Sequence, residues 1–416
     1  MKIKLPMRTQ LISLWRHRDF LKLWGAQTTS IFGTQLASLA YSLTAVVTLQ
    51  ATPVQIGLLN AVAAASAALV GLFAGVIADR FRRRPLLIGA DLGRAVIAVT
   101  IPVAFALGVL HIGQLYVVRF LFGALSIVSE VASMAFLPSL VERQQLVEGN
   151  SKLSATESVA SIAGPSLSGV LVQLLTAPIA IIFDVISFLF SAAFIWLIRT
   201  PEPEPLPADE RRSVWMEIGE GLRVVFSSPI LRPLSQGIAL HFLFMLIIST
   251  VFILYAVREL SLEPIWLGII LAAFGPGFLS GALIAGRVAK RFGPGPTMIG
   301  ATLVNALAVV LIPLASGPFP ALVSMLITAH FLLAFGIQIH GINLMSLRQA
   351  ITPDRLQGRM NASFRFINVC AMMMGALLAG VLGERIGLRA TLTVGACGMF
   401  LPFIRLLLSP VRKLND

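Results

Sequence analysis

The chain has 416 residues, of which 57% are hydrophobic and 12% are charged, whereas a soluble globular chain carries about 25% charged residues. This composition, with a mean hydropathy of +0.88, excludes a soluble enzyme of this length, and the abundance of apolar residues excludes intrinsic disorder. The net charge of +13 is therefore interpreted along a membrane topology, and nucleic acid is not expected as a partner.

Apolar runs that are long enough to cross a bilayer, about 20 residues each, follow one another along the whole chain. Short segments rich in Gly and Pro separate them. The pattern predicts an all-α membrane protein with twelve transmembrane helices. The expected spans are 20–49, 54–78, 85–108, 113–140, 154–175, 178–198, 232–256, 265–289, 296–315, 319–345, 362–383 and 389–408.

A polar segment divides these spans into two sets of six. It opens with Pro201-Glu202-Pro203-Glu204-Pro205, which cannot be helical. Farther on, apolar residues from Trp215 to Val225 recur at helical spacing, which is typical of an amphipathic helix in the membrane interface. The domain prediction is an N-terminal six-helix bundle over 1–198, a linker over 199–231 and a C-terminal six-helix bundle over 232–416.

Basic residues gather on the side of the membrane that holds both termini and the linker, which predicts that this side is cytoplasmic. A cleavable signal peptide is not expected, because the apolar segment after the basic N-terminus is too long. These features favour a bacterial inner membrane. Cys370 and Cys397 lie in apolar runs, so neither a disulfide framework nor a metal site is predicted.

The two sets of spans repeat each other when 211 is added to the residue number. Parallel repeats of this kind produce two bundles related by a pseudo-two-fold axis along the membrane normal, with the substrate between them near the midplane. The matches are Arg80-Phe81 with Arg291-Phe292, Arg119 to Leu121 with His330 to Leu332, Asn150 with Asn361, Gly164 with Gly375, and Gly169 to Leu171 with Gly380 to Leu382.

Ionisable residues inside the spans are the candidate functional groups, because each is costly in the membrane unless it is paired or hydrated. Arg119 and Glu130 lie about three turns apart on the fourth span and are expected to share one face. Glu130 in a partly dehydrated cavity can take up and release a proton; the alternative is a fixed hydrogen bond that packs helices. Asp184 in the sixth span lies at a depth similar to that of Arg119.

Other polar residues in the spans allow two interpretations. His330 and His340 in the tenth span could carry protons, although a lone membrane histidine more often makes an interhelical hydrogen bond. Asp91 and Arg94, three residues apart, predict an ion pair within the third span. The first span contributes a polar series that we expect to line a cavity, namely Gln27, Gln35 and Tyr41.

Three motifs resemble those of the major facilitator superfamily. They are the loop from Gly75 to Arg84, the fourth-span segment from Arg119 to Gly123, and Gly164-Pro165 with Gly169, which is similar to the glycine-proline motif of antiporters. Finer matches resemble the drug efflux pumps that include macrolide exporters and the enterobactin exporter. They are Asp91 to Arg94, Leu137 to Val141, Asp184 to Phe188, Gly219 to Arg223 and Gly358-Arg359 with Asn361.

The resemblance implies a cavity lined by the first, fourth, seventh and tenth spans. It also implies that Asp79 pairs with Arg359 at the start of the eleventh span and, with Arg80, Arg83 and Arg84, closes a cytoplasmic gate. The alternative is that these charges only anchor the topology. Arg82 stands where the loop motif usually has glycine, so the turn there must be made differently.

A nucleotide-binding loop of the Gly-x-x-x-x-Gly-Lys type is not found, so ATP is not the expected energy source. We therefore expect a monomeric, proton-coupled exporter of hydrophobic or amphipathic small molecules, such as drugs or siderophore-like compounds, that is neither an enzyme nor dependent on a cofactor. The alternatives are a lipid or lysolipid flippase, a proton symporter or a membrane sensor that transports nothing.

Overall fold

The computed structural model describes residues 14–200, 202 and 214–413, and only the backbone of residues 72–80, 143, 214–218, 220, 221, 354 and 355. The N-terminal half contains η1 (Leu14–Arg16), α1 (Arg18–Leu43), η2 (Thr44–Thr48), α2 (Pro53–Arg80), α3 (Arg83–Ala106), α4 (Ile112–Leu140), η3 (Arg143–Gln145), α5 (Leu146–Leu175), α6 (Ala177–Ala180) and α7 (Ile182–Trp196). The rest contains α8 (Val214–Ser227), α9 (Leu231–Arg258), α10 (Pro264–Ala272), α11 (Phe274–Phe292), α12 (Pro294–Leu314), α13 (Phe319–Ile351), α14 (Asp354–Ile386), α15 (Leu388–Gly398), α16 (Phe400–Leu407) and η4 (Pro410–Lys413).

Twelve helical segments of the described residues are long and apolar enough to cross a membrane, which confirms the predicted number. Four of these spans are built from two consecutive helices each: α1 with η2, α6 with α7, α10 with α11, and α15 with α16. The fifth helix begins at Leu146 rather than at 154. Its first turns contain the Glu148–Lys152 ion pair, with 3.2 Å between Oε1 and Nζ. Because these turns are polar, the apolar pattern of the sequence does not reveal them as part of the helix.

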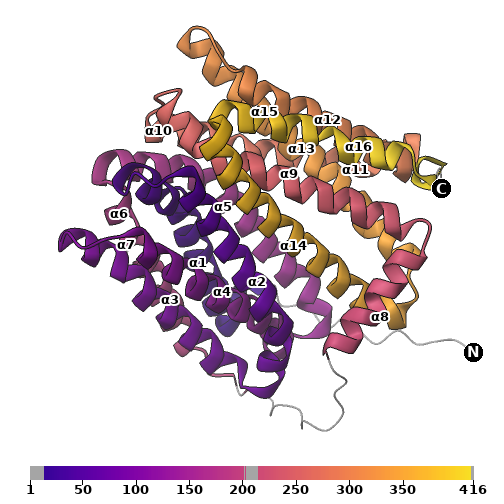
Figure 1. Cartoon of the computed structure of the whole chain (residues 1–416). Coiled ribbons are helices and arrows are strands. Elements are labelled where there is room, and N and C mark those ends of the chain that lie inside the picture. Colours follow the sequence, from indigo (N-terminus) through magenta and orange to yellow (C-terminus); the bar gives the residue numbers. More distant parts are fainter. Residues whose placement is uncertain (1–13, 201, 203–213, 414–416) are drawn as a thin grey trace, which may run out of the picture.

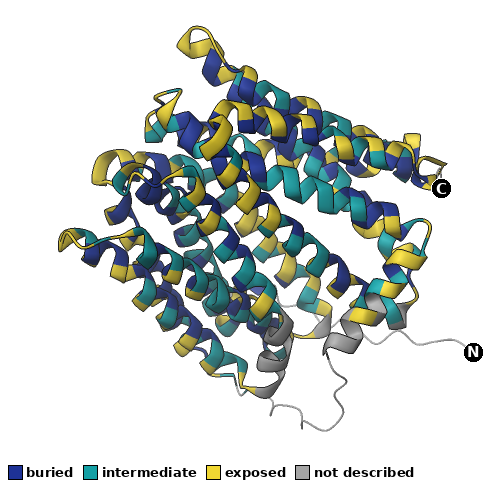
Figure 2. Ribbon diagram, viewed as in Figure 1, coloured by how far each residue is buried: buried dark blue, intermediate teal, exposed yellow. Residues whose placement is uncertain are grey.

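The six-helix halves lie side by side, and their loops fall on two faces (Figure 1). We call linker face the one that holds η1, η3, α8 and η4, and opposite face the one that holds η2, Thr176 and Gly387. Large apolar side chains are exposed on the outer surface, including Leu174, Trp196 and Leu408 at 67–74% (Figure 2), as expected for contact with lipid.

Two close helix crossings join the halves toward the opposite face. A Cβ built on Gly57 of α2 would lie 2.6 Å from the Ala376 carbonyl oxygen of α14, and one on Gly268 of α10 would lie 2.5 Å from that of Pro165 in α5. Backbones can approach this closely only where side chains are absent. Adding 211 to Gly57 gives Gly268, and adding it to Pro165 gives Ala376.

The partner glycines obey the same relation. A Cβ on Gly380 of α14 would lie 3.3 Å from the Gly57 Cα atom, and one on Gly169 of α5 would lie 3.2 Å from the Gly268 Cα atom. Since 169 and 380 also differ by 211, the α2–α14 and α5–α10 crossings are the same contact made twice. Two bundles related by a pseudo-two-fold axis are therefore present, as the repeat predicts.

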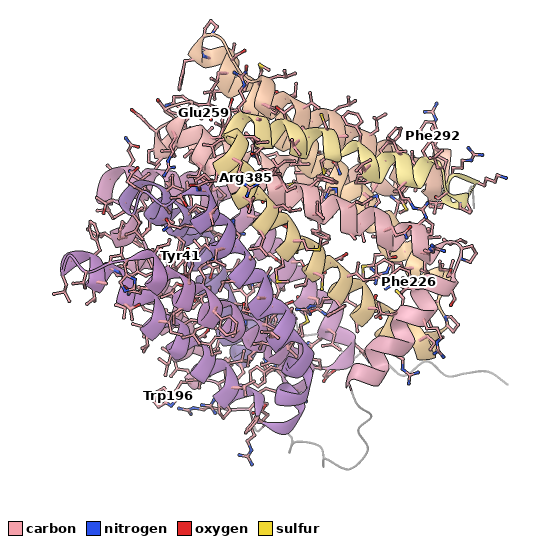
Figure 3. The ribbon with its side chains drawn as sticks, in the orientation of Figure 1. Tyr41, Trp196, Phe226, Glu259, Phe292 and Arg385 are labelled. Atoms are coloured by element: carbon pink, nitrogen blue, oxygen red, sulfur yellow. The ribbon has the colours of Figure 1, made fainter. Side chains whose placement is uncertain are left out.

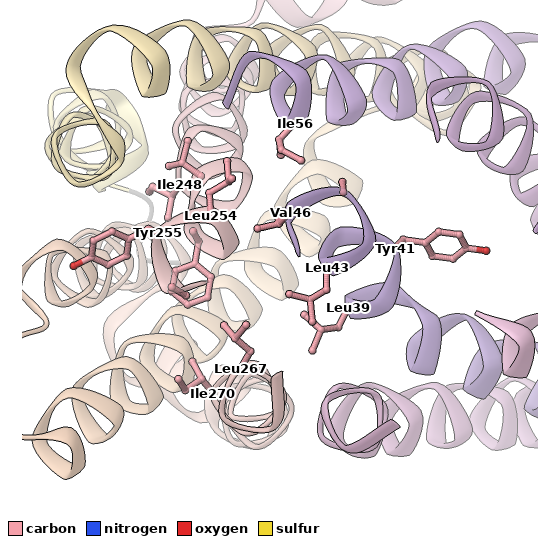
Figure 4. Packing of buried hydrophobic residues seen from close by; sticks show 14 of the residues in the cluster. Leu39, Tyr41, Leu43, Val46, Ile56, Ile248, Leu254, Tyr255, Leu267 and Ile270 are labelled. Atoms are coloured by element: carbon pink, nitrogen blue, oxygen red, sulfur yellow. The ribbon is translucent and has the colours of Figure 1, made fainter. Parts of the chain in front are cut away.

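A hydrophobic cluster reinforces this closed end. It contains buried residues of both halves, among them Leu43 and Val46 from the N-terminal half and Leu254 and Leu267 from the C-terminal half. Figure 4 shows these side chains facing one another between the bundles. The contact between α5 and the C-terminal half is extensive at α10 and small at α11, so on this side the halves separate toward the linker face. On the other side α2 stays close to α14 as far as Gly71, where an added Cβ would lie 3.6 Å from Arg365 Nη2.

The linker helix packs on the C-terminal half. α8 contacts α14 and α9, and Val225 is fully buried in a cluster with Leu231 and Phe364. Phe226, labelled in Figure 3, is exposed. An amphipathic helix is therefore present at the expected place, and at least its last turns are fixed to one bundle.

We predict that Gly268→Val opens the opposite face. The added side chain has no space beside Pro165 and Gly169, and overpacking of this kind costs about 1–3 kcal/mol. Electron paramagnetic resonance distances between spin labels at Leu107 and Ser316, in opposite-face loops of the two halves, should lengthen. Gly286→Val is the matched control, because a Cβ at Gly286 meets nothing within 4 Å; equal effects of the two variants would contradict the crossing as the closure.

Candidate functional site

A cavity of about 490 Å³ lies in the N-terminal half and extends from mid-depth toward the linker face. This volume is within the range of pockets that bind drug-sized ligands. Its polar lining comes mainly from α1, α4 and α5: Gln27, Ser30, Thr34, Gln35, Ser126, Ser129, Glu130, Ser133, Asn150, Ser154 and Glu157, with Arg94 from α3. Gln27, Gln35 and Glu130 thus lie in its wall, whereas the resemblance implies a cavity that the seventh and tenth spans also line.

Two carboxylates face this cavity at equal depth. Glu130 lies ten residues before the end of α4 and Glu157 lies eleven residues after the start of α5, which places each about 15–16 Å from the linker-face end of its helix. Both side chains are exposed to the cavity. Sequence analysis missed Glu157, although it is also an acid inside an expected span, and that signal alone would have found it.

An ion pair supports the cavity wall from behind. The Arg94 guanidinium donates to the Asp91 carboxylate, and its Nη2 atom also donates to Ser129 Oγ at 3.2 Å. Its centre lies 4.3 Å from the ring centroid of Phe188. Arg94 is 7% exposed and Asp91 is 2% exposed, so the third span contains the pair that its spacing predicts. The Arg94 Nε atom is buried without an acceptor.

Asp184 and Tyr41 lie behind the cavity and not in its wall, contrary to expectation. Asp184 is fully buried, and its carboxylate accepts hydrogen bonds from Tyr41 Oη at 3.2 Å and Thr34 Oγ1 at 3.4 Å. In Figure 4 the Tyr41 ring points away from Leu43 and Val46. The reason is depth, because Tyr41 lies six residues, about 9 Å, farther along α1 toward the opposite face than Gln35, the last residue of that helix in the cavity wall.

Arg119 also lies outside this cavity, although its spacing of eleven residues from Glu130 places both on one face of α4. The cavity begins at Ser126 on α4, seven residues closer to the linker face than Arg119. The end at which Arg119 lies is the end that the glycine crossings close. Arg119 is half-buried with its charge near Tyr41, and it is not within ion-pair distance of Asp184.

The C-terminal half has neutral residues and histidine where the N-terminal half has buried charges. At an offset of 211 the counterparts of Asp91, Arg94, Arg119, Glu130, Glu157 and Asp184 are Thr302, Asn305, His330, Gly341, Asn368 and Gly395. His330 is buried, lies 2.9 Å from the Leu326 carbonyl oxygen and packs on Phe252. His340 is half-buried, and its Nδ1 atom lies 3.5 Å from the Met298 carbonyl oxygen. At these six repeat positions, therefore, only the N-terminal half carries acids.

The residues of the expected gate are only partly described. The side chains of Asp79 and Arg80 lie outside the described residues. Arg83 and Arg84 donate backbone hydrogen bonds to Glu202 at the start of the linker, and the Arg84 side chain also donates to the carbonyl groups of Ile195 and Trp196 in the N-terminal half. Arg82 precedes α3 in extended backbone with φ −60°, and no glycine is needed there.

The glycine-proline motif serves two contacts. A Cβ on Gly164 would lie 2.5 Å from Gln35 Cβ, so this glycine lets α5 pack on the cavity-lining α1. Pro165 and Gly169 instead form the α5–α10 crossing between the halves. In the described part of the chain, no three His, Cys, Asp or Glu side chains come together, and we assign no metal centre.

Arg94→Ala is predicted to destabilise the protein by about 3–5 kcal/mol, because it leaves the Asp91 carboxylate buried without its cation. Lys152→Ala is the control, because the Glu148 partner is 38% exposed and such a pair contributes about 0–1 kcal/mol. Denaturant titration in detergent measures both, and Asp91→Asn combined with Arg94→Gln should recover part of the loss. Similar losses from both single variants would contradict the buried pair.

Comparison with known proteins agrees with this architecture. A model of the Major Facilitator Superfamily matches residues 23–371. The chain is 27% identical to an uncharacterized MFS-type transporter, YfiS of Bacillus subtilis, over 96% of this chain and 94% of the relative. It is 26% identical to the enterobactin exporter EntS of Salmonella typhi, over 82% of this chain and 80% of the relative.

Solved structures with the same fold include an inward-facing bacterial homologue of the iron transporter ferroportin, with a TM-score of 0.70, 14% identity and coverage of 93% of this chain and 98% of that one. A D-xylose-proton symporter gives a TM-score of 0.71 at 14% identity, covering 95% and 98%. The twelve spans, the duplicated crossing and the family match together establish that this chain is an integral membrane transport protein of the major facilitator superfamily.

Proposed function

We propose that the protein is a proton-coupled exporter of hydrophobic or amphipathic small molecules, with Glu130 and Glu157 as the proton-binding groups. One observation carries this proposal: two carboxylates lie at the same depth in a 490 Å³ cavity that is open toward one face and closed by the glycine crossings at the other. We propose that the transporter works as a monomer, with a cavity that residues of one chain can line.

The distribution of basic residues supports a cytoplasmic linker face. Arg82, Arg83 and Arg84 lie there, with Lys290, Arg291, Arg412 and Lys413, whereas few basic residues lie near the opposite face. By the positive-inside rule, the linker face is cytoplasmic. The conformation described here is then inward-facing, and its cavity receives substrate from the cytoplasm or the inner leaflet.

Coupling follows from the energy of closing the cavity. Two ionised carboxylates in a closed, dehydrated cavity are costly. The protein therefore changes between its inward-facing and outward-facing conformations only when both carboxylates are neutralised. Protons neutralise them on the inward movement, and a bound substrate that donates hydrogen bonds or carries positive charge replaces the protons on the outward movement. Because substrate and protons compete for the same groups, each can be exchanged for the other.

Similarity to relatives that are named enterobactin exporters supports export, and therefore exchange of substrate for protons, over proton symport into the cell. The asymmetry between the halves is consistent with this mechanism, because Gly341 and Asn368 stand at the positions equivalent to Glu130 and Glu157. Protons are then bound by the N-terminal half only. The buried Asp91–Arg94 pair and Asp184 keep that half rigid behind the two acids.

Glu130→Gln and Glu157→Gln should each abolish proton-driven uptake of substrate into inverted membrane vesicles, while binding at equilibrium persists. The amide cannot exchange a proton, so the coupling is lost. A panel of fluorescent lipophilic dyes serves as substrate, and an uncoupler defines the proton-driven component. Glu142→Gln, an exposed acid between α4 and α5, is the control. Full uptake by both acid variants would contradict the assignment.

The resemblance to the superfamily also supports a latch between Asp79 and Arg359 when the cavity faces outward. Asp79→Asn should then increase the inward-facing population. Spin labels at Val147 and Phe292, exposed on the linker face of the two halves, report this as a larger fraction of long distances. Unchanged distance distributions in Asp79→Asn and Arg359→Gln would reject the latch without affecting the roles of Glu130 and Glu157.

A further inference from the structure

A second cavity, of about 570 Å³, lies on the outer surface of the C-terminal half between α9 and α14. These helices touch where a Cβ on Gly375 would lie 2.2 Å from the Leu243 carbonyl oxygen, and from there the residues that line the cavity continue toward the linker face. Its walls are almost entirely apolar and include Leu240, Phe366, Ile367 and Met374. We call this cavity the outer groove.

The outer groove opens on the surface that faces lipid, away from the contact between the two halves. Ala376 and Gly380 face α2, whereas Met374 lies about 160° around α14 from Ala376. Met374 is 51% exposed, and Leu377, Leu378 and Val381, which continue this outer surface, are 42–43% exposed. An acyl chain of the bilayer is the apolar group that reaches such a surface.

The linker-face end of the outer groove carries an arginine with unused donors. Arg405, in α16, donates from Nε to Gln236 Oε1 at 2.8 Å. A guanidinium has five N–H donors, and the described residues offer no acceptor to the other four of Arg405. A cation at the edge of the apolar region requires such acceptors, because burying it without partners is costly.

A second arginine lies next to this end. Arg232 is exposed and lies four residues before Gln236, so it occupies the same stripe of α9 one turn closer to the linker face. The stripe continues through Leu240 and Leu243 into the outer groove. The groove thus has two guanidinium groups at one end and an apolar channel behind them.

We propose that the outer groove is a binding site for an anionic glycerophospholipid. Arg405 and Arg232 bind the phosphate and headgroup oxygens, and one acyl chain lies along Leu240, Phe366 and Met374. The planar guanidinium of Arg405 offers two parallel N–H groups to two phosphate oxygens, a geometry that an ammonium group does not reproduce. Gln236 holds that plane in place through Nε. The site is independent of the proposed transport cycle.

Native mass spectrometry of the full chain, released from detergent with equal amounts of phosphatidylglycerol and phosphatidylcholine of identical acyl chains, tests the site. The wild type should retain phosphatidylglycerol preferentially, and Arg405→Ala should weaken that binding about fivefold, as expected for one basic residue near a lipid surface. Arg405→Lys should bind at an intermediate level. Arg412→Ala, another exposed arginine of the linker face, is the matched control and should bind like the wild type.

Two further measurements locate the lipid. Phosphatidylglycerol with a photoreactive acyl chain should cross-link to peptides spanning 236–243 and 366–374. Cys370 lies in the outer groove, and Cys397→Ser leaves it as the sole cysteine of the chain. Phosphatidylglycerol should then slow its modification by a maleimide, whereas phosphatidylcholine should not.

Several results would overturn the proposal. They are equal binding of the two lipids, unchanged binding by Arg405→Ala, equal losses in Arg405→Ala and Arg412→Ala, or cross-links that map elsewhere. Dimers that protect Cys370 without lipid would identify a second copy as the occupant. Thermal unfolding in detergent shows that each variant is folded, and Glu130→Gln should bind phosphatidylglycerol like the wild type.

Discussion

Close backbone contact between the two halves is the constraint on which the rest of the structure depends. The α2–α14 and α5–α10 crossings bring glycine against backbone at distances that exclude any side chain. Because the two contacts are related by the internal repeat, they form a symmetrical seam at one end of the molecule. Closing that end leaves the other end apart, and the cavity of the N-terminal half therefore faces the linker side.

The charges inside the membrane break this symmetry. The backbone of one half repeats in the other, yet the buried ion pair and the acids of the cavity belong to the N-terminal half, and the equivalent positions hold Thr302, Asn305, Gly341 and Asn368. In the proposed exchange, a symmetrical scaffold allows two conformations, and the asymmetric set of acids makes the balance between them depend on protons and substrate. This division of roles links the fold to the proposed exchange.

Much of the fold could be predicted from the sequence, because hydropathy, turn residues and the constant offset of 211 are local or additive signals. Glu130, Gln27 and Gln35 line a cavity, but the fifth span lines it with them in place of the seventh and tenth spans that the resemblance implies. Tyr41 and Arg119 lie nearer the opposite face than the cavity reaches, because the polarity of a residue does not tell how far along a helix a cavity extends. To predict that Gly57 packs against Gly380, one must know that α2 pairs with α14. The sequence of a single span does not contain that information.

Proton release on substrate binding tests the central claim most directly. The purified protein is mixed, in weakly buffered detergent solution near neutral pH, with a dye that it transports, and a pH indicator records the protons released. The account predicts saturable release in the wild type and none when Glu130→Gln and Glu157→Gln are combined. Saturable dye binding by the wild type without any release of protons would contradict it.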